Sequence, residues 1–320
     1  MNSSVYKCIT CNENLFKERD GLKCNKGHSF RFLNETSIPV FEFDQSENEY
    51  TLKEVAERYD NSMNWVLETF CTTNEYLRTR LVSRLHLKLG DKVLVTGCGL
   101  GDDLPFICDK IGTEGIIYAQ DYSKEMVSEA QIRMNNDKRL SQYNIVFSVS
   151  DAANLPFKDA SFDAAYHFGG INLFPDIKKG ICEMDRVAKE GAKIVFGDEC
   201  VPAWLKNTEH AKMLIENNPL CEFDLPLEHL PITAREVNIS WEANYYFYVI
   251  EFVSSKEKLK INYNVPHKGL RGGNMQTRYY GKLEGIDLEL KNKIYKLASD
   301  KKVSRVDFME KLLKEGLKNV

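Results

Sequence analysis

Strands and helices alternate along the middle of this chain, and this alternation limits its fold more than any other feature. Apolar runs at 92–96, 115–121, 144–151, 162–168 and 192–199 predict strands, and stretches at 102–111, 123–135 and 175–189 predict helices between them. Repeated strand–helix steps form parallel sheets with helices on both faces. We therefore expect an α/β, doubly wound, mostly parallel sheet whose ligand lies beyond the carboxyl ends of its strands.

Two more β runs follow the alternation. The stretch "REVNISWEANYYFYVIEFVSS" contains one run on each side of "EAN", which predicts an antiparallel pair at the sheet edge and seven strands in total. Residues 200–234 interrupt the pattern, and an excursion at that point would overhang the ligand side. We expect one domain over 50–255, with 200–234 as a substrate-side insertion.

The stretch "KVLVTGCGLGDD" leaves the first of these strands, turns at alternating glycines and enters a helix. Gly97, Gly99 and Gly101 would bring bare backbone against a ligand. A dinucleotide fingerprint would need glycine at 102, but Asp102 and Asp103 stand there instead. Two carboxylates at a helix start repel the pyrophosphate that would bind there. The loop therefore favours a nucleoside ligand without phosphates.

Acidic residues end the next two strands. Asp121 lies about twenty residues past the glycine loop, where a carboxylate can accept both hydroxyls of a ribose. Asp151 ends the following strand, where a side chain can meet an adenine edge. Taken alone, either acid would be interpreted as a surface residue at the end of a strand. Their order after successive strands favours a ligand with a ribose and an adenine.

Four candidate metal ligands cluster near the start of the chain, over residues 1–45. In "CITCNENLFKERDGLKCNKGHSF", two residues separate Cys8 from Cys11 and three separate Cys24 from His28. Two such pairs on tight turns, joined by a short hairpin, predict a zinc ribbon with four ligands. Buried thiols beside a chance histidine are the alternative. A closed four-ligand site has no open position, so its role would be structural or recognitional.

Composition excludes several classes of protein. Nine cysteines without a signal peptide argue for reduced thiols or metal ligands. No apolar run approaches the roughly 18 residues of a membrane span, and "MNSSVYKC" lacks the features of a leader, so we expect a cytoplasmic protein without a membrane span. The chain has 43 Lys/Arg and 47 Asp/Glu, and its net charge is −4. Residues 256–320 carry 16 of the basic and 8 of the acidic residues, so residues 1–255 carry 27 basic and 39 acidic residues.

Residues 256–320 form a basic C-terminal extension. Its stretch "GKLEGIDLELKNKIYKLASDKKVSRVDFMEKLLKEGLK" predicts a strand, a helix, a turn and a second helix capped by Ser304. It weakly resembles ribbon-helix-helix modules, which dimerise. We expect a helical hairpin that packs on the body or on a second copy, so a homodimer through this extension is one expectation.

The central segments resemble class I S-adenosylmethionine-dependent methyltransferases, in the branch that includes quinone-biosynthesis C-methyltransferases. "VLVTGCGLG" resembles their first motif, "YAQDYSKEMVSEA" their second, and "VSDAANLPFKDASFDAAY" their D-x-x-x-LPF-x-x-x-SFD segment. The resemblance spans about residues 50–200 and implies a Rossmann-like fold with S-adenosylmethionine (SAM) as cofactor. The cofactor contacts that it implies are Gly97, Cys98, Gly99, Gly101, Asp102, Asp121, Tyr122, Asp151, Ala152 and His167.

One position departs from this family. Its members carry Asp or Glu two residues before the first glycine, as part of the network around the methionyl amino group, but this chain has Val95. We predict that Asp102 or Asp103 takes over this role from the first turn of the following helix.

A SAM-dependent methyltransferase acting on a small molecule by in-line displacement is the leading hypothesis. His167 follows the fourth strand, near the methyl group in this fold, and is the candidate base, although a lone histidine is more often a packing residue. Candidate substrate-side residues are Gly170, Trp204, His229 and Arg271.

Two alternatives stay open. The ribbon resembles that of bacterial ribosomal-RNA guanine methyltransferases, so RNA is a second candidate substrate, with the ribbon recognising it. An RNA enzyme would be expected to show a basic surface, whereas residues 1–255 carry a net charge of −12. A SAM-binding assembly protein without catalysis is the third hypothesis.

Overall fold

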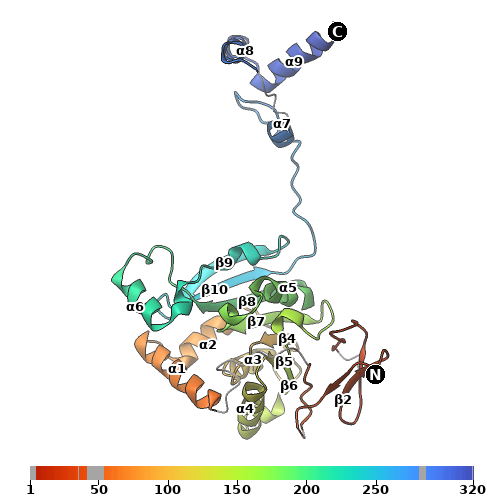
Figure 1. The fold of residues 1–320 in the computed structure, drawn as a ribbon, viewed down its shortest axis with the longest axis vertical. Coiled ribbons are helices and arrows are strands. Elements are labelled where there is room, and N and C mark those ends of the chain that lie inside the picture. Colours follow the sequence, from red (N-terminus) through yellow and green to blue (C-terminus); the bar gives the residue numbers. More distant parts are fainter. Residues whose placement is uncertain (1–4, 35, 42–53, 281–285, 319) are drawn as a thin grey trace. The chain divides into compact units, whose positions relative to one another are not determined.

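A seven-stranded sheet forms the centre of the first part of the chain (Figure 1). The computed structural model describes residues 5–34, 36–41, 54–280, 286–318 and 320. It divides into two units, Met1–Glu257 and Lys258–Val320. The strands of the sheet are β4 (Lys92–Thr96), β5 (Ile116–Asp121), β6 (Asn144–Val149), β7 (Phe162–Phe168), β8 (Ala188–Glu199), β9 (Arg235–Glu242) and β10 (Phe247–Val253).

The strand order is β6-β5-β4-β7-β8-β10-β9. The first five strands in this order are parallel, and β10 pairs antiparallel with both β8 and β9. The predicted mostly parallel, seven-stranded, Rossmann-like sheet is therefore confirmed, including the antiparallel pair at its edge. Because the five parallel strands run in one direction, their carboxyl ends share one edge, where the predicted cofactor residues lie.

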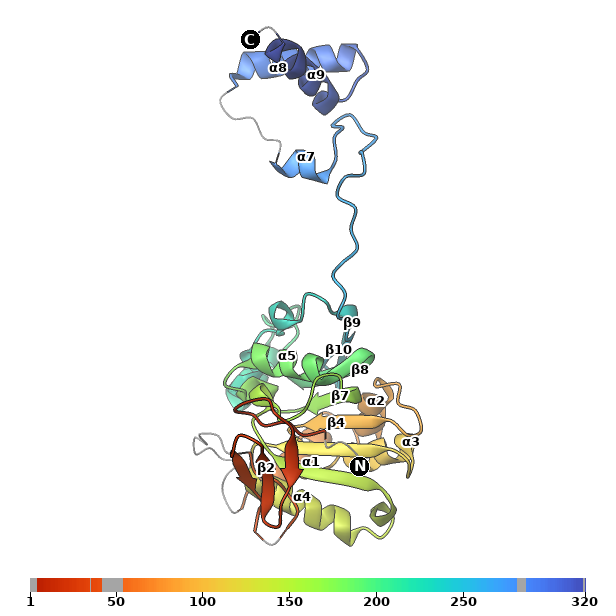
Figure 2. The same cartoon turned by 90° about the vertical axis from the view of Figure 1, so that its right-hand side faces the viewer.

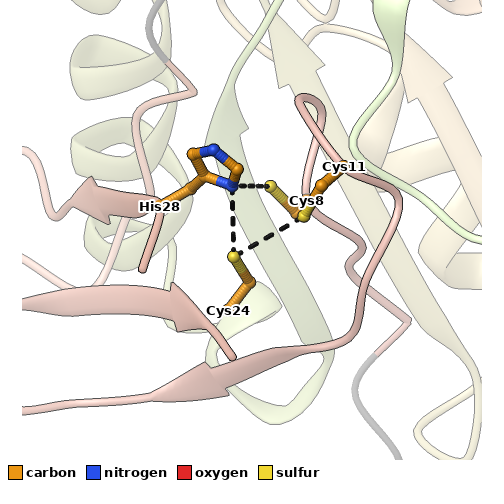
Figure 3. Close-up of side chains that lie close together, drawn as sticks. All are labelled: Cys8, Cys11, Cys24 and His28. Carbon is orange, nitrogen blue, oxygen red and sulfur yellow. Dashed lines mark hydrogen bonds between the residues drawn. The ribbon is translucent and has the colours of Figure 1, made fainter. Parts of the chain in front are cut away.

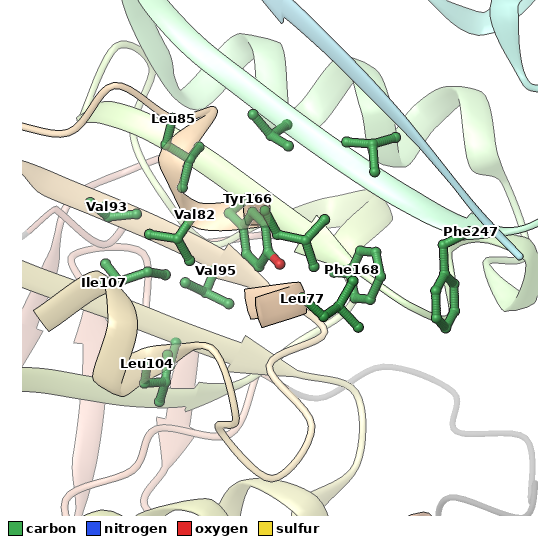
Figure 4. Close-up of a cluster of buried hydrophobic side chains, with 14 of the residues drawn as sticks. Leu77, Val82, Leu85, Val93, Val95, Leu104, Ile107, Tyr166, Phe168 and Phe247 are labelled. Carbon is green, nitrogen blue, oxygen red and sulfur yellow. The ribbon is translucent and has the colours of Figure 1, made fainter. Parts of the chain in front are cut away.

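Helices cover both faces of the sheet. The first face packs against α2 (Asn74–Ser83), α3 (Leu104–Ile111) and α4 (Lys124–Asn136), and the second packs against α5 (Ile177–Val187). Side chains alternate between faces along each strand, so Val93 and Val95 enter the first core and Leu94 enters the second. Figure 4 shows part of the first core. A further helix, α1 (Val55–Thr69), precedes α2.

The N-terminal segment forms a small separate sheet of three antiparallel strands, β1 (Leu15–Lys17), β2 (Gly21–Cys24) and β3 (Ser29–Arg31). We call residues 5–34 and 36–41 the ribbon. It packs against the large sheet (Figure 2), and the β-bridge between Val40 and Val149 joins it to the edge strand β6. Its four candidate metal ligands converge on one point (Figure 3). The predicted boundary between this module and the domain, at 45–50, falls outside the described residues.

The predicted insertion at 200–234 contains α6 (Glu209–Asn217) and two short 3-10 helices, η5 (Pro219–Glu222) and η6 (Leu227–His229). Ala211 and Leu214 of α6 enter the core of the first face, while Leu225 and Leu230 pack on the core of the second. The insertion therefore leaves the carboxyl end of β8 and reaches both faces of the sheet.

The second unit contains α7 (Met275–Tyr280), α8 (Leu288–Asp300) and α9 (Arg305–Leu317). The predicted helical extension is present, and the Ser304 hydroxyl accepts a hydrogen bond from the Asp307 N–H over 3.1 Å to cap α9. The predicted strand before α8 falls on 281–285, outside the described residues. Across the described part of the chain, no helix is long and apolar enough to cross a membrane.

Candidate cofactor and metal sites

The glycine loop at the end of β4 adopts backbone conformations that favour glycine. Gly97, Gly99 and Gly101 have φ values of 56°, 52° and 86°, in the left-handed region. A Cβ on Gly97 would also lie 2.8 Å from Cε1 of His167. The loop therefore presents bare backbone at the carboxyl end of β4, as the alternating glycines predict.

Asp121, at the end of β5, fastens this loop to the next strand. Its Oδ2 accepts the Gly99 N–H over 2.9 Å, and its Oδ1 accepts the Ser123 N–H over 2.9 Å. Burial raises the pKa of the Asp121 carboxyl, and these two backbone donors oppose the rise. The carboxylate is thus held at the carboxyl end of β5, beside the glycine loop. Tyr122 follows and is half-buried.

Cys98 is held in the same loop. Its N–H donates to the Gln120 carbonyl over 2.9 Å, and burial raises the pKa of its thiol well above the ordinary value. The thiol is therefore protonated at neutral pH. Such a thiol is a packing group in the loop and a poor nucleophile.

The turn after β6 contains the second predicted acid. Oδ1 of Asp151 accepts the Ala153 N–H over 2.8 Å and so caps η3 (Ala152–Asn154), a short 3-10 helix. The Ser150 carbonyl accepts a hydrogen bond from the Gln120 side chain. Because β4, β5 and β6 are neighbours in the sheet, the glycine loop, Asp121 and Asp151 lie side by side at one edge.

Arg78 of α2 connects the two aspartates of the loop, a contact that the sequence analysis missed. The side chain is 1% exposed, and its Nη1 lies 2.9 Å from Oδ2 of Asp103. Its Nη2 lies 3.4 Å from Oδ2 of Asp102, which is 24% exposed. The Tyr166 hydroxyl donates to Oδ1 of Asp103 over 3.0 Å. Both carboxylate oxygens of Asp103 therefore have a polar partner, whereas Asp102 makes one long contact with Arg78.

Burial and neighbouring charges act in opposite directions on the pKa values of this network. Burial lowers the pKa of Arg78, but Asp103 and other neighbours outweigh this effect and raise it. Burial raises the pKa of Asp103, and Arg78 opposes that rise. The guanidinium also lies over the Phe168 ring, 5.4 Å from its centroid. One guanidinium thus faces the carboxyl groups of two aspartates.

Val95, two residues before the first glycine of the loop, lies on the same side of the sheet as this network. Val95 pairs in register with Tyr166 of β7, and both side chains enter the first core (Figure 4). An acid at position 95 would therefore point toward the face where Tyr166 meets Asp103. Asp103 supplies a carboxylate on that face from the helix side.

Helix α1 covers the glycine loop. A Cβ on Gly99 would lie 3.9 Å from the hydroxyl of Tyr59, and Val55 packs with Leu100. Arg133 of α4 donates to both carboxylate oxygens of Asp60, over 3.1 and 2.8 Å. The glycine loop is thus covered by α1, which has few buried residues of its own.

His167, the predicted base, is a buried residue of β7. It is 1% exposed, its Nδ1–H donates to the Thr96 carbonyl over 2.9 Å, and its ring packs edge-on against Phe174. Burial lowers the pKa of the imidazole, so it is neutral at pH 7. These contacts are those of a packing residue, and a role as base stays a prediction.

The predicted substrate-side residues lie on different elements of the chain. Gly170 has a φ of 94° in the turn after β7, and Trp204 is 60% exposed and packs edge-on against Trp241 with centroids 5.0 Å apart. His229 lies in η6, which contacts α5. Arg271 is an exposed residue of the second unit. Their roles stay predictions.

The four ribbon side chains form a compact ligand set (Figure 3). Their donor atoms all lie within 4.8 Å of one another; the sulfurs of Cys11 and Cys24 are 3.7 Å apart, and Nδ1 of His28 is 3.5 Å from Sγ of Cys8. A tetrahedral zinc ion with bonds of about 2.3 Å separates two sulfurs by about 3.8 Å, so the set fits that ion. Burial opposes ionisation of Cys24, but hydrogen bonds from the backbone of His28 and Lys26 help to lower its pKa to about 6.

This fold, with its loops at the carboxyl ends of parallel strands, defines a class of protein, the Rossmann-like α/β domains. The model of the ubiE/COQ5 methyltransferase family matches residues 43–203, half of the sequence. The chain belongs to that family. The ribbon and the C-terminal extension lie outside the matched segment.

Curated relatives cover the same central segment. Demethylmenaquinone methyltransferase of Desulfitobacterium hafniense is 31% identical over 156 residues, which are 48% of this chain and 58% of the relative. 2-Phytyl-1,4-naphtoquinone methyltransferase of Nostoc punctiforme is 34% identical over 111 residues, 35% of this chain and 47% of that one. The chain therefore spans about half the length of the curated relatives it matches.

A solved structure supports the fold alone. Haemonchus contortus phosphoethanolamine N-methyltransferase 2, crystallised with S-adenosyl-L-methionine, superposes with a TM-score of 0.50 at 14% identity. The match covers 68% of this chain and 62% of that one.

Proposed function

We propose that this protein binds SAM and transfers its methyl group to a small-molecule acceptor. The observation that carries the proposal is the row formed by the glycine loop, Asp121 and Asp151 at three neighbouring strand ends. Asp102 and Asp103 at the start of α3 repel phosphates, so the row suits a nucleoside that carries an amino acid in place of a pyrophosphate.

Each part of the row has a task. Asp121 would accept the ribose hydroxyls, and Asp151 with the Ala152 N–H would bind the adenine edge. Gly97, Gly99 and Gly101 would let the backbone approach the methionyl chain. The bound cofactor supplies an electrophilic methyl group on a sulfonium, and the protein's own contribution is to align an acceptor with it and exclude water.

Asp102 is the proposed partner of the methionyl ammonium, in place of the acid missing at Val95. Its carboxylate is partly exposed and held by one contact of 3.4 Å, so it can turn toward a new cation at low cost. Asp103 cannot do so without breaking its bonds to Arg78 and Tyr166. Asp103 would thus hold the loop while Asp102 binds the ammonium.

The acceptor would lie at the ends of β7 and β8, next to the cofactor row. Asp198 there is committed, because its oxygens accept the N–H groups of Asn172 and Glu199 over 2.7 and 2.9 Å. Burial, reinforced by the nearby Asp198, raises the pKa of Glu199 well above the ordinary value. Glu199 is therefore a second candidate, beside His167, for the group that takes a proton from the acceptor.

The names of the relatives, which refer to quinone methylation, support a small-molecule acceptor. RNA is less favoured, since residues 1–255 carry a net charge of −12 and one side of the ribbon packs against the body. A SAM-binding protein without catalysis is less favoured, because the matched relatives are named as methyltransferases.

The ribbon is proposed to hold a structural zinc ion on Cys8, Cys11, Cys24 and His28. Four ligands close the coordination sphere, which is typical of sites that stabilise a fold. The short strands of the ribbon bury few side chains, so a metal would supply stability that its own core cannot.

Equilibrium binding of SAM to the purified protein tests the cofactor site. Asp121→Asn should weaken binding about tenfold or more, because a neutral amide accepts ribose hydroxyls less well than a carboxylate. Asp109→Asn, an exposed acid on α3, is the matched control and should bind as the wild type does. Absence of SAM binding by the wild type would refute the proposal.

A further inference from the structure

The ribbon is joined to the end of β6, where the turn after that strand begins. Val40 forms a parallel bridge with Val149: the Phe41 N–H donates to the Val149 carbonyl over 2.9 Å, and the Val149 N–H donates to the Pro39 carbonyl over 3.0 Å. Val149 is the last residue of β6, an edge strand of the large sheet. We call residues 150–158, which follow directly and include Asp151 and Ala152, the adenine loop.

The other end of the adenine loop is also joined to the ribbon. The Lys7 N–H donates to the Pro156 carbonyl over 2.8 Å, and the Lys158 N–H donates to the Val5 carbonyl over 2.9 Å. Lys7 directly precedes Cys8, a candidate metal ligand. Backbone hydrogen bonds to the ribbon thus hold the adenine loop at its beginning and at its end.

Aromatic side chains connect the metal ligands to these joints. Tyr6 stacks on Phe157 of the adenine loop with centroids 5.2 Å apart and lies 5.5 Å from Phe41. Phe30, two residues after His28, lies 5.0 Å from the same Phe41 ring. Cys8 and His28 therefore each lie two residues from a ring that packs on Phe41, and Phe41 donates to the end of β6.

Helix α5 holds the adenine loop from the opposite side. Oε2 of Glu183 accepts the Leu155 N–H over 2.8 Å, and Arg186 donates to the Leu155 and Phe157 carbonyls over 3.1 and 2.8 Å. The loop would therefore persist without the ribbon's metal, but its ends at Val149 and Lys158 would lose fixed partners. A loss of cofactor affinity with a retained domain fold is the expected consequence.

We propose that the metal-loaded ribbon positions the adenine loop, so that affinity for the cofactor depends on metal occupancy of the Cys8, Cys11, Cys24 and His28 site. Tyr6 and Phe41 are then positioning residues, which act on the cofactor through Asp151 and Ala152. This inference rests on the proposed function, since it needs SAM binding at the strand-end row. The ribbon would serve the cofactor site from within the chain, instead of serving as an RNA-binding module.

The test measures binding of S-adenosylhomocysteine by calorimetry to the full-length protein with and without zinc. Zinc content is measured in every sample, and metal is removed with a chelator under reducing conditions. Zinc removal and Phe41→Ala should each weaken binding about tenfold, which corresponds to one lost net hydrogen bond. Phe16→Ala, an exposed ring of β1 in the same ribbon, is the control and should bind normally.

A double-mutant cycle separates positioning from general loss of stability. The effects of Phe41→Ala and Asp151→Ala should be non-additive, because both act at the adenine end. The effects of Phe41→Ala and Asp102→Asn should add, because Asp102 lies at the methionyl end. Additive effects in both pairs would overturn the proposal.

The outcomes remain distinct from failure of the proposed function. If the zinc-loaded wild type fails to bind S-adenosylhomocysteine, the proposed function fails. If it binds equally well with and without zinc while circular dichroism reports a folded domain, or if it carries no zinc, this inference alone fails. If the zinc-free protein unfolds, the test is the affinity of zinc-loaded Phe41→Ala for S-adenosylhomocysteine. A wild-type affinity in that variant overturns the inference.

Discussion

Arg78 and Asp103 form a buried ion pair, with Nη1 and Oδ2 2.9 Å apart, between α2 and the start of α3. The pair lies on the sheet face toward which an acid at position 95 would point, and Tyr166 from β7 completes it. The Asp103 carboxylate thus lies on this face at the start of α3, with an arginine to compensate its burial.

Arg78→Met should lower the free energy of unfolding by about 3–5 kcal/mol, because it leaves the Asp103 carboxylate buried without its cation. Urea denaturation measures the loss. Arg139→Met removes an exposed pair with Asp109 and should cost less than about 1 kcal/mol. Similar losses in the two variants would contradict the structural role of Arg78.

Asp102→Asn and Asp103→Asn should differ in what they impair. Asp102→Asn should weaken SAM binding about tenfold and leave stability nearly unchanged, since its carboxylate is partly exposed. Asp103→Asn should destabilise the protein by about 1–3 kcal/mol, because the Arg78 guanidinium loses its counter-ion. Calorimetry and denaturation on both variants check this division, and unchanged SAM affinity in Asp102→Asn would sink the assignment of the ammonium site.

Gly97→Ala combines two costs, a left-handed backbone and a Cβ placed 2.8 Å from the His167 ring. We expect a loss of about 2–4 kcal/mol in stability and impaired SAM binding. Gly191→Ala is the matched control, because its φ is 80° but nothing lies within 4 Å of its Cβ. Equal losses would show that the approach to His167 is unimportant.

Stability should fall below about pH 6.5 in a way that depends on His167. Burial lowers the pKa of this histidine in the folded state, so as pH falls the unfolded chain, with a pKa of about 6.5, takes up the proton first. The free energy of unfolding should then drop by up to about 1.4 kcal/mol per pH unit, relative to His167→Gln. His210→Gln, an exposed histidine, should keep the wild-type slope. If the free energy of unfolding depends on pH in the same way for the wild type and His167→Gln, then His167 is not buried in its neutral form.

The sequence was sufficient to predict the sheet, because strand and helix periodicities alternate from Lys92 to Glu199 without ambiguity. It was also sufficient for the ribbon, since the spacing of Cys8, Cys11, Cys24 and His28 admits few geometries. Arg78 could not be found this way: an arginine beside Leu77 on a helix looks like a surface residue until tertiary packing buries it. The same holds for His167, whose position after a strand suggested chemistry but whose side chain enters the core.

The contact between the ribbon and β6 could not be predicted from the sequence either. Val40 and Phe41 are an ordinary apolar pair in the sequence, and nothing local indicates that they extend the sheet beside Val149. Pairings between distant segments depend on the folded arrangement of both partners, which a local pattern does not encode.

Transfer of labelled methyl from SAM to an extract of the source organism tests the central claim most directly. The extract is incubated with the protein, with and without ribonuclease, and then separated into small molecules and macromolecules. We predict label in the small-molecule fraction, unaffected by ribonuclease and lost with Asp121→Asn. Label in RNA that ribonuclease releases, or no transfer by a protein that binds SAM, would contradict the account.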